Sequence, residues 1–98
     1  MENVKSVENK LQKLIDQYKL GEVLTIGMIK DLIWCEEGDK AFNDFIEEAF
    51  GHFKDVKDIN ELNRILQVFN DAWNYFPHKS LNGKSPMQVV EESKNNQN

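Results

Sequence analysis

Residues 58–77 read DINELNRILQVFNDAWNYFP. Apolar side chains recur at every third or fourth position through this stretch, and that spacing is typical of one face of an α-helix. The apolar face consists of Leu62, Ile65, Leu66, Phe69, Ala72, Trp73 and Phe76. Asp58 and Glu61 have the D-x-x-E spacing of a capping box at the start of a helix, and Pro77 marks the end, because the residue before a proline is driven out of helical geometry. We therefore predict a helix over residues 59–75.

Four other stretches share this period and predict further helices. They cover residues 2–19, 25–37, 41–53 and 86–93. The residues expected to bound them are Thr25, Asp39 and Ser85 at the starts, and Gly21 and Gly38 at the ends. Ser85 has capping-box spacing to Gln88, with Pro86 at the first helical position, where a proline is tolerated.

The helix expected over residues 41–53 has the most strongly apolar face in the chain. That face consists of Phe42, Phe45, Ile46, Ala49, Phe50 and Phe53. Each buried phenylalanine removes on the order of 150–250 Å² of surface from water, so these rings can anchor a core. We expect Trp73 to be buried at the centre of that core, in contact with the phenylalanines.

The whole chain is expected to fold as one all-α domain. No run of alternating apolar and polar residues predicts a strand, and the connections between the expected helices are short. The sequence has 98 residues, which suits a single domain. We predict a five-helix bundle or an orthogonal helical array over residues 1–94, followed by a disordered polar tail over residues 95–98.

Composition narrows the classes of function. The formal net charge is −5, whereas nucleic-acid binders usually carry a basic face, so nucleic acid is not the expected partner. No apolar run approaches the roughly 20 residues that span a bilayer, so no membrane association is expected. Cys35 is the single cysteine, which fits a reducing, cytoplasmic location.

Candidate catalytic and metal-binding residues lack supporting motifs. Cys35 and His52 could serve as nucleophile and base, but they fall on different expected helices. Glu48 and His52 lie four residues apart, a spacing that also suits an ordinary surface pair. No H-x-x-x-H or C-x-x-C pair offers two metal ligands from one element. We therefore predict a protein that is not an enzyme and that has no metal and no cofactor.

The segment between the last two helices concentrates positive charge before a helix start. His78, Lys79, Lys84 and Ser85 form a candidate site for an anion or a partner, because unpaired helix amides attract negative groups. The alternative is an ordered turn, in which Gly83 adopts a positive φ and Ser85 caps the next helix.

Residues 73–86 read WNYFPHKSLNGKSP and resemble the C-terminal segment of retroviral-type integrases and insertion-sequence transposases. That segment reads roughly Y-N-x-x-R-P-H-x-x-L-x-G-x-[ST]-P, and the matching positions are Pro77, His78, Leu81, Gly83, Ser85 and Pro86. The resemblance implies a nucleic-acid-associated module and would put Glu47 at the third catalytic carboxylate of that family. The family's active site also needs a sheet and two aspartates, and Phe76 replaces its arginine, so no catalytic residue is carried over. The W-N-x-x-P ending is also similar to that of small uncharacterised helical proteins.

The first helix carries a narrow apolar stripe with steps of three and four. The stripe consists of Val4, Val7, Leu11, Leu14 and Tyr18. A stripe of this width suits one facing helix. Two arrangements satisfy it: a homodimer in which the stripes of two copies meet, and packing on the second and fourth helices within one chain.

Together these patterns favour a protein-interaction module that binds an unknown protein partner or a second copy of itself. The alternative is a nucleic-acid-associated module that uses the basic segment between the last two helices.

Overall fold

The computed structural model describes residues 3–35 and 38–95 and shows an all-α fold. Its helices are α1 (Val4–Gln17), α2 (Ile26–Cys35), α3 (Ala41–Phe50), α4 (Ile59–Tyr75) and α5 (Pro86–Asn95), with 3-10 turns at Gly51–Phe53 and Lys79–Leu81. The described ranges contain no strand, and one isolated bridge joins His78 to Lys84. The predicted fold class is thus confirmed.

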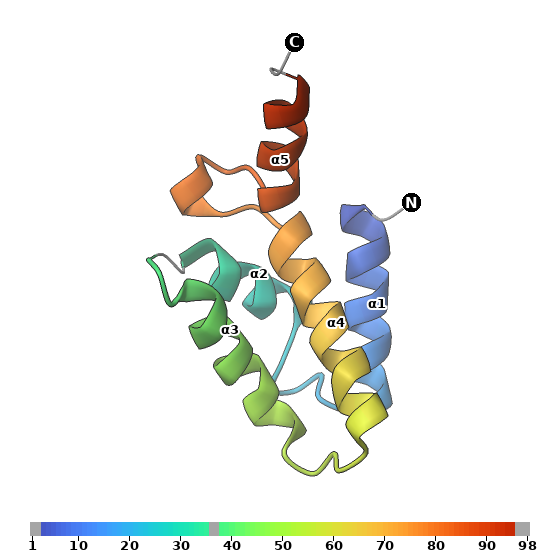
Figure 1. Ribbon diagram of the computed structural model, residues 1–98. Coiled ribbons are helices and arrows are strands. Elements are labelled where there is room, and N and C mark those ends of the chain that lie inside the picture. The colour runs from blue at the N-terminus through green and yellow to red at the C-terminus, as the bar shows by residue number, and fades with distance from the viewer. Residues whose placement is uncertain (1–2, 36–37, 96–98) are drawn as a thin grey trace.

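The helices form a packed body with one helix projecting from it (Figure 1). α1 and α4 run antiparallel side by side and make the most extensive helix contact, while α2 and α3 close the core from the other side. α5 continues beyond the end of α4 and, among the helices, makes its main contact with α4. Because α5 projects from the body, the molecule is elongated, with extents of 48 × 28 × 23 Å along its principal axes.

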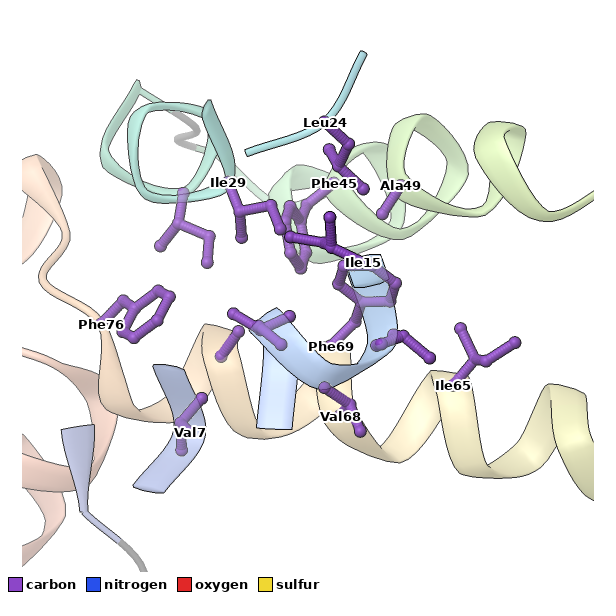
Figure 2. Packing of buried hydrophobic residues seen from close by; sticks show 14 of the residues in the cluster. Val7, Ile15, Leu24, Ile29, Phe45, Ala49, Ile65, Val68, Phe69 and Phe76 are labelled. Atoms are coloured by element: carbon purple, nitrogen blue, oxygen red, sulfur yellow. The ribbon is translucent and has the colours of Figure 1, made fainter. Parts of the chain in front are cut away.

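The core draws side chains from α1 to α4 and from the segments between them (Figure 2). Its buried members are Val7, Leu11, Leu14, Ile15, Leu24, Ile29, Ile33, Phe45, Ala49, Phe53, Ile65, Val68, Phe69, Ala72 and Phe76. Phe69 is at the centre of an aromatic cluster, because its ring lies 6.0 Å from that of Phe45 and 5.8 Å from that of Phe53. The prediction that the phenylalanines of residues 41–53 anchor the core is confirmed for Phe45 on α3 and Phe53 on the following 3-10 turn, whereas Phe42 and Phe50 are half-buried.

The buried face of α4 is rotated from the predicted one. Val68 is buried although the predicted face does not contain it, and Leu66, which belongs to that face, is 38% exposed. The reason is the close packing of α1 on the flank of α4 that carries Val68, which lies beside Lys10 and Lys13 of α1. Trp73 is consequently half-buried at the edge of the core, so its predicted central position is wrong.

Three helix starts have side-chain caps at the predicted residues, although of the capping box predicted for Asp58 and Glu61 only the Asp58 half forms. The hydroxyl of Thr25 accepts a hydrogen bond from the amide of Met28, and the carboxylate of Asp58 accepts one from the amide of Asn60. Ser85 and Gln88 form the complete predicted capping box.

Other helix ends differ from the predicted ones. α3 begins after Lys40 and has no side-chain cap, so the predicted cap Asp39 is wrong. α3 also ends at Phe50 and continues as a 3-10 turn. The predicted end of α2 at residue 37 lies outside the described residues.

The end of α1 is a Schellman motif that does not use Gly21. The amide of Leu20 donates to the carbonyl of Ile15, and the amide of Lys19 donates to that of Asp16. Lys19 takes the left-handed position of the motif with φ 57°. Leu20 must follow that position directly to pack against the core, so a lysine, and not the later glycine, adopts the unfavourable conformation.

At the C-terminal end, α5 reaches Asn95, which corrects the predicted start of the polar tail at that residue. The rest of the predicted tail, residues 96–98, lies outside the described residues. In the described part of the chain, no helix is long and apolar enough to cross a membrane.

Candidate functional site

The segment after α4 is organised by Pro77. In a regular helix the amide of residue 77 would donate to the carbonyl of Trp73, but proline has no N–H group. The Nε2 atom of His78 lies 2.7 Å from that carbonyl oxygen and donates to it instead. The His78 ring also packs edge-on against the indole of Trp73, with ring centroids 4.5 Å apart. His78 is therefore buried as a side-chain cap of the helix end.

The backbone of His78 closes the following loop. Its amide donates to the carbonyl of Lys84 at 3.0 Å, and its carbonyl accepts from the amide of Gly83 at 2.9 Å. Asn82 and Gly83 both adopt left-handed conformations, with φ 58° and 83°, so the predicted positive φ of Gly83 is confirmed. The loop is thus fixed by its own backbone.

The loop rests on α2, which sequence reasoning did not anticipate. A Cβ atom on Gly83 would lie 3.9 Å from the ring of Trp34. Trp34 is otherwise exposed, and its apolar ring contacts the turn at Gly83. Gly83 is needed there for its positive φ, and not for the approach to Trp34, because 3.9 Å is an ordinary contact distance.

The predicted anion or partner contact separates into two buried and two exposed residues. His78 and Ser85 are buried and hydrogen-bonded within the chain, whereas Lys79 and Lys84 are exposed. The Nζ atom of Lys84 pairs with Glu92 at 2.7 Å. The first turn of α5 offers few donors, because Pro86 has no N–H group and the amide of Gln88 is bound to the Ser85 hydroxyl. The geometry is that of the ordered turn.

Most of the apolar stripe of α1 is buried within the chain. Val7, Leu11 and Leu14 are buried in the core, and Tyr18 packs its ring 5.3 Å from that of Phe53. Val4, at 41% exposed, is the stripe residue that faces solvent. Of the two arrangements that the stripe allowed, packing within one chain is the one observed.

Val4 lies instead on an open groove between the start of α1, the end of α4 and α5. The groove has a volume of about 350 Å³ and is lined by Asn3, Val4, Tyr75, Pro77, Gly83, Ser85, Met87, Gln88 and Glu91. Among the described side chains of α5 none is buried, and Val90 is 48% exposed. Val4, Tyr75 and Met87 line this groove, and Val89 and Val90 expose apolar atoms elsewhere on α5; we call these five residues the end surface.

The candidate catalytic pair lines a different cleft, between α2 and α3. Cys35 is exposed, His52 is half-buried, and both lie at the rim of a hollow that also includes Glu48. Cys35 is not a core residue, although a free cysteine at the end of an apolar helix is usually buried. Across residues 3–35 and 38–95, no group of three or more His, Cys, Asp or Glu side chains is placed to hold a metal ion.

The chain has no significant match among protein-family models, curated protein sequences or solved structures.

Proposed function

We propose that this protein is an interaction module whose end surface packs against another protein or a second copy of the chain. One observation carries the proposal: α5 is a formed helix that buries none of its described side chains, beside a groove that Val4, Tyr75 and Met87 line together with polar side chains. A ten-residue helix is marginal in water by itself, and contiguous exposed apolar surface commonly marks a site of association. The unpaired, exposed thiol of Cys35 suits the reducing cytoplasmic setting that belongs to this proposal.

The end surface has the composition of an interface centre. Val4 and Met87 line the groove from opposite helices, and Val90 follows Met87 by three residues on the same face of α5. Two carboxylates lie on the same helix: Glu91 also lines the groove, and Glu92 pairs with Lys84. Apolar residues at the centre and charged residues at the rim are the usual arrangement in protein interfaces.

Site-specific crosslinking tests the proposal. A photoreactive amino acid at Val90 should give a discrete protein adduct in native extract. The yield of that adduct should decrease when Val4, which lines the groove from α1, is changed to serine. The matched control is the same amino acid at Lys57, which is exposed and precedes the start of α4, at the end of that helix away from α5. Equal adducts from both positions would contradict the proposal.

Sedimentation equilibrium then separates self-association from binding of another protein. A dimer at about 100 μM that Val90→Ser converts to monomer identifies a second copy as the partner. A monomer at that concentration, together with a discrete adduct from Val90, identifies a different protein.

The competing proposal is a nucleic-acid-associated module. It would use Lys79 and Lys84, which are exposed, but Lys84 is already paired with Glu92 and the neighbouring His78 is buried. Sub-micromolar binding of DNA or RNA at physiological salt, lost on changing Lys79 and Lys84 to Glu, would favour this function over protein binding.

A further inference from the structure

A second hollowed surface lies between α2 and α3, on elements other than the end surface. Two hollows of about 320 and 280 Å³ adjoin each other, because Leu32 and Glu48 line both of them. Their apolar floor consists of Leu24, Met28 and Leu32, and their acidic rim consists of Asp31, Asp44, Glu47 and Glu48. We call this surface the acidic groove.

The carboxylates of the acidic groove are not neutralised within the chain. Ion pairs at other places engage Glu8 with Lys30, Asp71 with Lys10, Glu61 with Arg64 and Glu92 with Lys84. Within the described residues, none of the four rim carboxylates forms such a pair, and the half-buried His52 is the one basic side chain that lines the groove. Four like charges around an apolar floor create a field that attracts a cationic partner.

The floor of the groove presents apolar surface that a partner can cover. Met28 on α2 is 46% exposed, and Leu32, one helical turn later, is half-buried. Methionine is unbranched and polarisable, so it adapts to the shape of different apolar side chains. Burial of Met28 under a partner would remove apolar area from water, which supplies affinity that charge attraction does not.

We propose that the acidic groove binds an amphipathic, basic helix of another protein. Two packed helices with a hollow between them form the usual receptor for a third helix, whose apolar residues at positions i, i+3 and i+7 occupy the floor. Lysine or arginine residues on both flanks of that helix would then face the rims, with Asp31 on α2 and with Asp44, Glu47 and Glu48 on α3. α3, which carries three of the four rim carboxylates, has ten residues and is about 15 Å long, so a partner helix of about 12 residues covers its length.

A synthetic peptide tests the inference. The probe is a fluorescent helical peptide of about 14 residues with leucine at positions i, i+3, i+7 and i+10 and lysine on both flanks, and the matched peptide has glutamate in place of every lysine. Fluorescence anisotropy with the full chain should give a Kd of about 10–100 μM for the basic peptide and at least tenfold weaker binding for the acidic one. Raising the salt concentration from about 0.05 M to about 0.5 M should weaken the basic complex.

Matched variants locate the site. Glu47→Lys with Glu48→Lys should weaken binding at least tenfold, whereas Asp16→Lys with Glu91→Lys changes the net charge equally on α1 and α5 and should weaken it less than threefold. Met28→Ser should weaken binding about fivefold, and Val23→Ser, which alters an exposed valine outside the groove, should not. Circular dichroism and thermal melting confirm that each variant is folded.

The outcomes separate this inference from the proposed role of the end surface. Val4→Ser with Val90→Ser should leave peptide binding unchanged, because those residues lie outside the acidic groove. Equal weakening by both charge-reversal pairs, or equal binding of both peptides, would overturn the inference. Self-association that Glu47→Lys with Glu48→Lys abolishes, in the absence of peptide binding, would also overturn it and would identify a second copy as the occupant.

Discussion

The imidazole of His78 donates a hydrogen bond to the carbonyl oxygen of Trp73, which Pro77 leaves without its helical amide donor. A buried carbonyl that loses its donor carries a desolvation cost of about 1–3 kcal/mol. His78→Phe keeps a ring against Trp73 but removes the donor, so it should lower the free energy of unfolding by that amount. His78→Ala also loses the ring contact and should cost more. Urea unfolding measures both, and a His78→Phe variant as stable as the parent would contradict the capping role.

Phe69 and Trp73 should contribute unequally to stability. Phe69 is fully buried against the rings of Phe45, Phe50 and Phe53, so Phe69→Ala should cost about 3–5 kcal/mol. Trp73 is half-buried and keeps solvent on one side, so Trp73→Ala should cost about 2–3 kcal/mol. Chemical denaturation of the two variants decides the order, and the reverse order would mean that the centre of the core lies nearer Trp73.

Aspartate substitutions along the stripe of α1 should have opposite effects at two positions. Leu11 is fully buried, and an unpaired carboxylate there costs more than a small domain's total stability, so Leu11→Asp should unfold the chain. Val4 lies on the end surface, so Val4→Asp should fold normally. Far-UV circular dichroism at 25 °C distinguishes the two cases. A folded Leu11→Asp variant would show that the stripe is not a core element.

Tyr18 should make stability fall in alkaline solution. Partial burial of its phenol and, to a smaller extent, the nearby Glu61 carboxylate raise the pKa of Tyr18 above its usual 10.0. Below pH 10 the phenol is protonated in both folded and unfolded chains, so its contribution is fully present. As the pH rises through the higher folded pKa, the unfolded chain has already released its proton and the contribution is lost. Tyr18→Phe should therefore lose less stability than the parent between about pH 9 and pH 11, and equal slopes would contradict the assignment.

Gly83 and Gly51 should respond differently to alanine. Gly83 has φ 83°, so Gly83→Ala should cost about 1–2 kcal/mol although the added Cβ meets Trp34 only at an ordinary contact distance. Gly51 has φ −54° and open space around it, so Gly51→Ala should be neutral or stabilise by up to about 1 kcal/mol. Thermal melting of the two variants gives the comparison, and equal losses would mean that the backbone of Gly83 is not the cause.

The helices could be predicted from sequence because their period and their caps are local properties. α4 has its predicted bounds, and the capping box of Ser85 and Gln88 forms as expected. The rotation of the buried face of α4 could not be predicted, because it depends on which flank α1 covers. The left-handed conformation of Lys19 could not be predicted for a related reason. The packing of Leu20 against the core, and not the position of a glycine, decides where α1 ends.

The candidate sites were less accessible to sequence reasoning. His78 was selected for its charge, whereas its position after Pro77 makes it a donor to the helix end, a role visible only once the Trp73 carbonyl is known to lack a partner. The end surface could not be predicted from the sequence, because the exposed Val4 belongs to the same stripe as the buried Val7 and Leu11. The acidic groove depends on the packing of α2 on α3, which no pattern in either helix encodes.

The exposed position of α5 has a consequence for native-state hydrogen exchange. No described side chain of α5 is buried, so its backbone amides should exchange with solvent through local opening of the helix. The amides of α1 and α4, whose side chains form the core, should exchange only through global unfolding. A protein that covers α5 would then slow exchange in this segment selectively. Part of its binding energy would be used to hold the helix closed, so affinity at this end of the molecule would respond to any change that alters the intrinsic helicity of residues 86–95, even one that never touches the partner.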